Sequence, residues 1–463
     1  MNQKLLMAIY FYPRGGSSQV VRYLYQRLEK KWSSALYSGS LGNKGLLTNA
    51  ETFYRPLNVK SLDYTTAHTA WQKGTNPFDT ENPMQASLED RINVPDTLMA
   101  RLSPEQLAKQ IQSWRHLFSK ELLEPALAHL HHLTPMHNAV YELWKKTKII
   151  THLHGTELKM IEYIRSNPKL PFGDWWIEKM IENANMSNLI ITVSPHDRDL
   201  ALELLSVPKH KVITIPNGVD IEIFKPTTLP DKVKMSYWKH WLVTDPQGWK
   251  PNHNPGTIRY TENDLKEFYN DDGSCAPILL FVGRFTTFKR INVLLDAYSI
   301  FKSHSKQNAP LIIWGGFPGE WEGEHPYEFA RKRSIDGVFF SGWRGHDDLP
   351  LGLTSSNIFV APSVREPFGQ TYLEAMACAL PVIATSTGGP ASFINTEPGK
   401  KTGWLVNPDD PYSLANALQE AVEDQNLRET AGQNARDYIE RMYSWDNIAE
   451  QFTSTYQYVL SHK

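Results

Sequence analysis

Two glutamates eight positions apart, Glu366 and Glu374, flank a loop in the stretch SVREPFGQTYLEAMACALPVIATSTGGP. A helix that begins near Gln370 would present the amides of Gly369, Gln370 and Thr371 at its N-terminus, where phosphate is stabilised. Glu374, about one turn further along, could accept hydrogen bonds from two ribose hydroxyls, and Glu366 could reach a sugar joined to that phosphate. The stretch therefore predicts one loop that holds ribose, diphosphate and sugar in order. The alternative is that neither glutamate binds a ligand: one would only interact favourably with the helix dipole, and the other would be an ordinary surface acid.

A second set of polar residues follows a buried strand in the stretch FVGRFTTFKR. This strand ends in glycine, and Arg284 and Lys289 come after it. Two cations near helix-terminal amides would form a diphosphate clamp. The alternative is a solvated basic turn.

A glycine pair, Gly15 and Gly16, follows the first apolar run of the chain. Such a turn permits a tight backbone, and Ser17 or Ser18 is expected to cap the helix that carries Arg22. Free amides at this helix start would suit an anion. Many strand-to-helix turns contain glycine for steric reasons alone, so the pair also fits a purely structural role.

Histidines mark two further strand ends. His152 and His154 lie in THLHGTELKMIE, and several more lie in HLHHLTPMHN, residues 129–138. Zinc is not expected at the first pair because no third ligand follows at a fitting spacing. A histidine that binds a substrate hydroxyl and a simple helix start capped by Thr156 are the two interpretations left.

The elements that must position these residues are short apolar runs separated by helix-length segments. Runs that are apolar on both faces are typical of parallel sheets covered by helices. The candidate strands form two series: residues 5–12, 148–154, 188–194 and 211–217, then 277–283, 310–316, 337–343, 357–363 and 381–386. The proline-rich stretch 224–232 separates the series, which predicts two doubly wound α/β domains facing each other across a cleft.

Two segments interrupt this alternation. Residues 60–102 are polar and contain several prolines, and residues 232–276 contain Trp238, Trp241 and Trp249 among prolines, asparagines and glycines. Between them, SPEQ at residues 103–106 predicts the start of a long amphipathic helix, with a serine cap and proline at the first position.

The composition is that of an ordinary globular protein. The chain has 463 residues, of which 41% are hydrophobic and 21% charged, and its net charge of -2 gives no indication of nucleic-acid binding. Two distant cysteines indicate a reducing compartment. No apolar run approaches the roughly 20 residues that span a bilayer, and the start of the chain is expected to be a strand rather than a signal peptide. A cytoplasmic protein is therefore expected.

At these residues the chain resembles the retaining family-four glycosyltransferases of the GT-B fold, also called glycosyl transferases group 1. The matching pieces extend over nearly the whole chain, and the combination of the glutamate pair with VGR and lysine upstream is the specific one. They are the N-terminal glycine pair, HGTE, VS at 193, PNGVD, VGRFTTFKR, SGWRGHDDLP, the two-glutamate stretch and TGWLVNPDDPYSLANAL.

The resemblance implies roles for particular residues. Glu366, His154 and Gly16 would act at the reacting centre, with Glu366 contacting the donor sugar rather than acting as a nucleophile. The expected donor-binding residues are Arg284 and Lys289 for the diphosphate, Glu374 for the ribose, Trp343 and Arg344 beside the base, and Glu366, Phe368, Gly369, Gln370 and Thr371. The expected acceptor-binding residues are Gly15, Ser17, Arg22 and His137, and no metal ligand is expected.

The resemblance also implies an organisation. Residues 1–222 would bind the acceptor, with an insertion at about 60–102, and residues 223–440 would bind the nucleotide sugar, with an insertion at about 232–276. Residues 441–463 would pack back on the first domain. The two enlarged segments depart from the family pattern and are expected to shape acceptor choice or an interface.

The implied reaction is retaining transfer of a hexose from a nucleotide sugar, UDP-glucose or UDP-GlcNAc for example, to a small polar acceptor such as a sugar or cyclitol, without a cofactor or metal. The chain also allows a homodimer. The alternatives are a GDP-mannose-type donor, a lipid or polysaccharide acceptor, a nucleotide-sugar epimerase, a phosphorylase, and a non-catalytic protein that binds sugar nucleotides. A cofactor-dependent phosphorylase would need a Schiff-base lysine, and no lysine stands out for that role.

Overall fold

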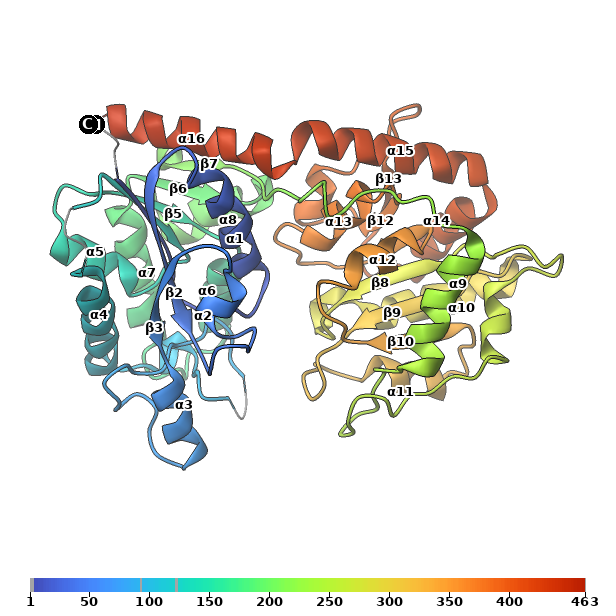
Figure 1. The fold of residues 1–463 in the computed structure, drawn as a ribbon, viewed down its shortest axis with the longest axis horizontal. Coiled ribbons are helices and arrows are strands. Elements are labelled where there is room, and N and C mark those ends of the chain that lie inside the picture. Colours follow the sequence, from blue (N-terminus) through green and yellow to red (C-terminus); the bar gives the residue numbers. More distant parts are fainter. Residues whose placement is uncertain (1–3, 92–93, 121–123, 463) are drawn as a thin grey trace. The chain divides into compact units, whose positions relative to one another are not determined.

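The computed structural model describes residues 4–91, 94–120 and 124–462, and it divides into two compact units. Unit 1 comprises Met1–Asn217 and Trp445–Lys463, and unit 2 comprises Gly218–Ser444 (Figure 1). These limits lie within a few residues of those expected from the sequence. Within the described part of the chain, no helix combines the length and apolar character needed to cross a membrane.

Unit 1 is built on a seven-stranded parallel sheet. Its spatial order is β3-β2-β1-β4-β5-β6-β7, so the order along the chain reverses between β1 and β4. The strands are β1 (Lys4–Ile9), β2 (Ser33–Ser40), β3 (Val59–Asp63), β4 (Leu127–His131), β5 (Lys148–His152), β6 (Leu189–Thr192) and β7 (Val212–Thr214). Residues at the start of the predicted insertion therefore form an edge strand, β3.

Helices cover both faces of this sheet. Leu6 and Ala8 of β1 enter one core, and Leu5, Met7 and Ile9 enter the other, as the two-residue period of a strand requires. The helices are α1 (Gly16–Leu28), α2 (Ala50–Phe53), α3 (Thr65–Gln72), α4 (Pro104–Phe118), α5 (Met136–Leu143), α6 (Thr156–Ser166), α7 (Gly173–Met186), α8 (Pro195–Leu205) and α16 (Trp445–Ser461).

Two of these helices follow directly from sequence signals. The side chain of Ser103 accepts from the Gln106 amide and the Gln106 side chain accepts from the Ser103 amide, so α4 begins with the predicted capping box. Helix α16 contacts α1 and places Trp445, Phe452 and Tyr456 in the second core of unit 1.

Unit 2 contains a six-stranded parallel sheet in the order β10-β9-β8-β11-β12-β13, which reverses between β8 and β11. The strands are β8 (Leu279–Gly283), β9 (Leu311–Gly315), β10 (Val338–Gly342), β11 (Ile358–Ala361), β12 (Val382–Thr385) and β13 (Gly403–Val406). The helices are α9 (Asp231–Lys239), α10 (Ile291–His304), α11 (Pro326–Lys332), α12 (Leu349–Thr354), α13 (Gln370–Ala377), α14 (Pro411–Glu423) and α15 (Gln425–Met442).

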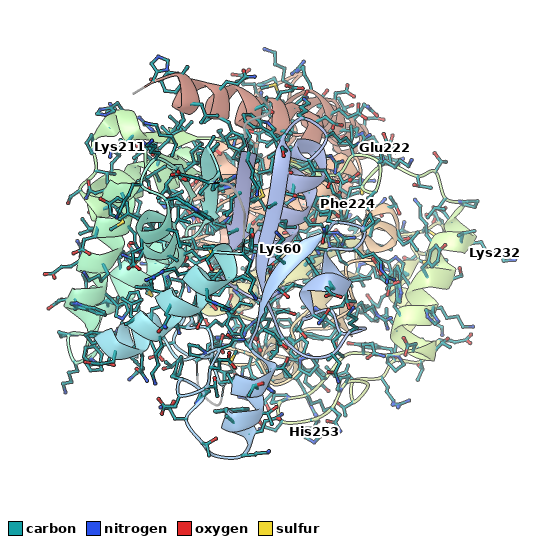
Figure 2. All side chains as sticks on the ribbon, turned by 60° about the vertical axis from the view of Figure 1, so that its left-hand side comes forward. Lys60, Lys211, Glu222, Phe224, Lys232 and His253 are labelled. Atoms are coloured by element: carbon teal, nitrogen blue, oxygen red, sulfur yellow. The ribbon has the colours of Figure 1, made fainter. Side chains whose placement is uncertain are left out.

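The tryptophan-bearing segment 232–276 is part of the core of unit 2. Its three tryptophans are buried. The indole N–H of Trp238 donates to the Ser355 carbonyl at 3.0 Å, and that of Trp249 donates to the Gly316 carbonyl at 2.8 Å. Lys232 and His253 of the same segment lie at the surface (Figure 2).

Candidate active site

In unit 2 the loops after β8 and β11 emerge side by side where the strand order reverses. Open parallel sheets bind ligands at such a switch point, beyond the carboxyl ends of the strands. The Val364 amide donates to the Phe288 carbonyl at 3.0 Å and thereby joins the two loops. The sheet order therefore brings the predicted basic loop and the predicted glutamate loop together.

A lysine and a carboxylate meet at this point. The Nζ atom of Lys289, after β8, donates to Oε2 of Glu366, after β11, and both side chains are largely buried. Arg284, which directly follows β8, is exposed. The switch point thus holds a close cation–carboxylate pair with a second cation on the same loop.

The main chain of Glu366 is fixed by a glycine pair after β12 that the sequence analysis did not assign to the site. The Gly389 amide donates to the Glu366 carbonyl at 2.8 Å. A Cβ atom at Gly389 would lie 2.3 Å from the Pro367 carbonyl oxygen, so only glycine fits without a backbone shift. The signal was available, because the pair GG comes a few residues after a buried strand, as at Gly15 and Gly16.

Helix α13 begins at Gln370, as predicted. Gly369 precedes it with a φ of +98°, in the left-handed region that favours glycine. The amides of Gln370 and Thr371 belong to the first turn of the helix, so they have no carbonyl of the helix to bind. The Gln370 side chain donates to the Gly218 carbonyl at 2.8 Å. Phe368, before the turn, is buried against Phe393 and Tyr443.

Glu374 lies in the second turn of α13 and is only 4% exposed. Loss of solvation in this site raises the pKa of its carboxyl from 4.5 to about 8. The side chain is therefore mostly protonated at neutral pH in this structure. A ligand that donated hydrogen bonds to the carboxylate would favour its ionised form.

The two residues expected beside the base differ in their surroundings. Trp343, after β10, is 48% exposed and packs edge-to-face against exposed Phe317, after β9, with ring centroids 5.7 Å apart. Arg344 is buried instead, and its guanidinium donates to the Trp241 carbonyl at 3.0 Å and contacts Asp245. Arg344 thus anchors the segment 232–276 rather than facing an open site, and Phe317 is the aromatic partner that the sequence did not indicate.

In unit 1 the glycine pair begins α1 without a serine cap. Gly15 is the N-cap with extended backbone, no side chain caps the helix, and Ser18 is buried, so the predicted cap was wrong. Ser17, beside the pair, is half-buried. A Cβ atom on Gly15 or Gly16 would meet no described atom within 4 Å. Neither local sterics nor backbone conformation therefore requires glycine at these two positions.

Two expected acceptor-binding residues have other contacts. His137 is fully buried, and its ring nitrogens contact the Thr134 carbonyl at 3.0 Å and the Thr151 hydroxyl at 2.8 Å. Arg22 places its guanidinium over the Phe53 ring, 5.6 Å from the centroid, and reaches the carbonyl of residue 55. Both residues have partners inside unit 1, and their part in acceptor binding stays a prediction.

His154 lies just beyond the carboxyl end of β5 and is held by neighbouring side chains. Its Nε2 contacts Nδ1 of His131 at 2.9 Å, and its backbone amide donates to Glu157 at 3.3 Å. Glu157 also contacts Nδ1 of buried His132 at 2.5 Å. Burial lowers the pKa of His154 well below its ordinary value, so the ring is neutral.

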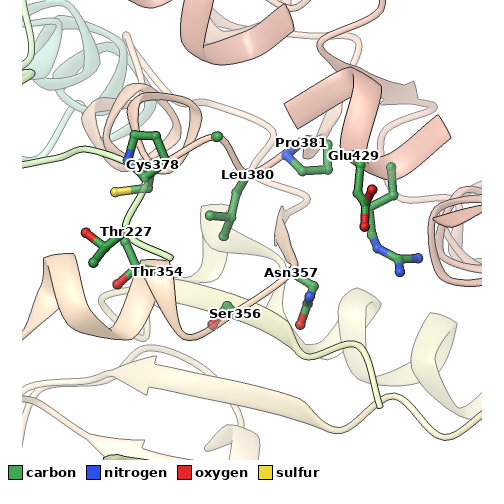
Figure 3. Close-up of a pocket in the computed structure, with 11 residues that line it drawn as sticks. Thr227, Thr354, Ser356, Asn357, Cys378, Leu380, Pro381 and Glu429 are labelled. Carbon is green, nitrogen blue, oxygen red and sulfur yellow. The ribbon is translucent and has the colours of Figure 1, made fainter. Parts of the chain in front are cut away.

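A pocket of unit 2 lies away from these residues (Figure 3). Its lining includes Asn357 and Pro381, which precede β11 and β12, together with Thr227, Cys378 and Glu429. It is therefore at the amino ends of the strands, opposite the loop that carries Glu366. Its volume is about 150 Å³, and it contains none of the predicted site residues.

Two parallel sheets, each reversing its strand order once and each with its conspicuous polar residues at the carboxyl ends, define a two-domain α/β protein of the GT-B type. Two family models match the chain: Glycosyltransferase Family 4 over residues 66–223 and Glycosyl transferases group 1 over residues 268–438. Together they cover more than two thirds of the sequence. The chain belongs to this glycosyltransferase family.

Individual curated relatives match only part of the chain. The chain is 33% identical over 208 residues to a D-inositol 3-phosphate glycosyltransferase of Corynebacterium kroppenstedtii, which covers 44% of this chain and 45% of that protein. The matched parts span less than two thirds of the length of such curated relatives.

Solved structures match the fold over nearly the whole chain. Sucrose-phosphate synthase from Thermosynechococcus elongatus superposes with a TM-score of 0.68 at 20% identity, covering 99% of this chain and 100% of that one. HepE from Anabaena, solved in complex with UDP-glucose, gives 0.64 at 17% identity, covering 98% and 99%. Structural neighbours of this fold therefore bind a nucleotide sugar.

Proposed function

We propose that the protein is a retaining hexosyltransferase that moves a sugar from a UDP-sugar to a hydroxyl of a small polar acceptor. The observation that carries the proposal is the contact between Lys289 and Glu366 beside the start of α13, at the switch point of unit 2. Cations, helix-terminal amides and a sugar-binding carboxylate are what a nucleotide diphosphate sugar requires in one place.

Each group in unit 2 has a part in holding the donor. Lys289 and Arg284 bind the diphosphate together with the first amides of α13. Glu374 accepts from the ribose hydroxyls, and Trp343 with Phe317 offers an exposed aromatic surface to the base. Glu366 binds hydroxyls of the transferred sugar once the diphosphate engages Lys289.

The chemistry follows from the charges. The bond between the anomeric carbon and the diphosphate oxygen breaks while the acceptor oxygen attacks from the same face. The departing phosphate oxygen takes the proton of the acceptor hydroxyl, which preserves the anomeric configuration. Lys289, Arg284 and the dipole of α13 stabilise the charge that develops on the diphosphate, so the transfer needs neither a cofactor nor a metal.

Unit 1 supplies Gly16 and His154 at the reacting centre and Gly15 beside them for the acceptor. The open surroundings of the glycine pair support this assignment, because the fold of unit 1 does not itself require glycine there. The D-inositol 3-phosphate glycosyltransferase among the relatives supports a polyhydroxylated acceptor such as a cyclitol or sugar.

The test is calorimetric binding of UDP, GDP and ADP, followed by turnover of the matching sugar nucleotides with a panel of acceptors. We expect UDP to bind without Mg²⁺ and Glu366→Ala to lose transfer while it keeps UDP binding. The exposed Glu397 provides the matched control, Glu397→Ala, which should behave as the unchanged protein. Full turnover in Glu366→Ala would refute the assignment. Preference for GDP would indicate a GDP-mannose-type donor, and conversion of UDP-GlcNAc without acceptor would indicate an epimerase.

A further inference from the structure

Three fully buried histidines of unit 1 lie together on one face of the sheet. His131 of β4 is paired in register with His152 of β5, and His129 lies two residues earlier on the same face of β4. The ring centroids are 4.4 Å apart for His129 and His131, 5.0 Å for His131 and His152, and 5.4 Å for His129 and His152. Helix α16 covers them through Phe452 and Tyr456.

The ring nitrogens of this cluster divide into an outer and an inner set. Nδ1 of His129 contacts the Tyr456 hydroxyl at 2.5 Å, and Nδ1 of His131 contacts Nε2 of His154 at 2.9 Å. The Nε2 atoms of His129 and His131 and both ring nitrogens of His152 are buried without a hydrogen-bond partner among the described residues. A buried polar atom that makes no hydrogen bond costs free energy, and here four such atoms occur in one cluster.

We propose that His129, His131 and His152 form a binding site for a divalent transition-metal cation of the Zn²⁺ class. One ligand atom from each of the three lies within 4.8 Å of the others. Zn–N bonds of about 2.0–2.1 Å place the nitrogens of a tetrahedral site roughly 3.4 Å apart. The rings now stack within about 36° of one another, so rotation of the imidazoles about their side-chain torsions closes the site.

The outer contacts are those that a metal-bound histidine makes. With the cation on Nε2 of His129, the Nδ1–H group donates to the Tyr456 oxygen. With the cation on Nε2 of His131, its Nδ1–H group donates to Nε2 of His154. Such outer partners fix the tautomer and orientation of ligating histidines. Three imidazoles without a carboxylate select Zn²⁺ and its neighbours rather than Mg²⁺ or Ca²⁺, which prefer oxygen ligands.

The spacing of residues in the sequence did not show this site, because its ligands come from two strands. His152 and His154 lack a third ligand nearby along the chain, but parallel pairing of β4 with β5 supplies two. The cation would tie β4 and β5 to α16 and would act on the stability of unit 1. The transfer reaction proposed for the chain has no step that uses this cation, and the contact of His131 with His154 is the point at which the two sites adjoin.

The test uses the full chain, stripped with a chelator and dialysed against micromolar Zn²⁺, with bound metal counted by mass spectrometry. We expect one Zn²⁺ per chain and a midpoint of thermal unfolding that rises with Zn²⁺ concentration. His152→Phe should bind none, and exposed His116→Ala, the matched control, should bind one. Tyr456→Phe keeps the three ligands and should bind 10- to 100-fold more weakly, which tests the site even if His152→Phe does not fold.

Three results would overturn the proposal. They are the absence of stoichiometric Zn²⁺ in the unchanged chain, stoichiometric Zn²⁺ that persists in His152→Phe, and an unchanged affinity in Tyr456→Phe.

Discussion

Neutralising Glu374 should stabilise the free protein while it harms nucleotide binding. In the folded state burial raises the pKa of this carboxyl from 4.5 to about 8, so the folded chain retains a proton that the unfolded chain releases. Stability from this group is therefore greatest below pH 4.5 and is lost progressively as the pH rises toward 8. Glu374→Gln keeps the shape of the protonated side chain and a polar group at its end, but it cannot ionise. The variant should therefore not lose stability as the pH rises.

The size of the effect follows from the interval between pH 4.5 and the pH of the experiment. Each pH unit corresponds to about 1.4 kcal/mol, so Glu374→Gln should gain about 3 kcal/mol at pH 7 and close to nothing at pH 4.5. For a unit of this size the gain at pH 7 corresponds to a rise in unfolding temperature of about 6–12 °C.

The assay is denaturant or thermal unfolding of both proteins from pH 4.5 to pH 7.5. The exposed Glu423 at the end of α14 supplies the control, because Glu423→Gln should change stability little at any pH. A stability difference for Glu374→Gln that stayed constant across this range would show that the carboxyl is ionised in the folded chain. Burial would then not raise the pKa of this carboxyl in the folded chain.

Three further predictions concern the site. Because ribose hydroxyls favour the ionised form of Glu374, UDP binding at pH 7 should release close to one proton. The release would appear as a dependence of the calorimetric binding enthalpy on the ionisation enthalpy of the buffer. If the binding enthalpy is the same in all buffers, the ribose assignment is wrong. Trp343→Ala should weaken UDP binding by roughly 10- to 100-fold, as expected when a base loses an aromatic stacking partner worth about 1–3 kcal/mol. If the variant binds UDP as tightly as the unchanged protein, the base does not lie beside Trp343. His137→Ala should lower the free energy of unfolding by about 2–3 kcal/mol, because it leaves the buried partners of His137 without a hydrogen bond. The KM for the acceptor should not change. A raised KM would support the acceptor-binding role expected from the sequence.

The strands that the sequence predicted were those with continuous apolar runs, such as LLFVG in β8 and LIIWG in β9. Strand β2 was missed because its sequence, SSALYSGS, is rich in serine and glycine although its last five residues are buried. Its Ser38 hydroxyl donates to a backbone carbonyl at 2.8 Å, which allows a polar side chain inside the sheet. The edge strand β3 was missed for a similar reason, because only Val59 and Leu62 of its sequence VKSLD are apolar and buried.

The candidate site was predictable where one loop carries its residues, as in the turn from Glu366 to Glu374. Pairings between loops were not predictable, because they depend on which strands are neighbours. The contact of Lys289 with Glu366 needs β8 beside β11, and the histidine cluster needs β4 beside β5. Adjacent residues can also diverge, since Trp343 is half exposed and Arg344 is buried under the segment 232–276.

Helix α16 has a consequence for the order in which the chain folds during synthesis. Unit 2 is continuous in sequence, so all of its strands and helices are present once residue 444 has left the ribosome. Unit 1 begins first but lacks Phe452 and Tyr456 until the last segment emerges, which leaves the part of one apolar face that α16 covers exposed in the meantime. Exposed apolar faces of this kind bind chaperones and aggregate. We therefore expect truncation before Trp445 to impair the folding of the unit that was made first, and to leave the folding of unit 2 unaffected.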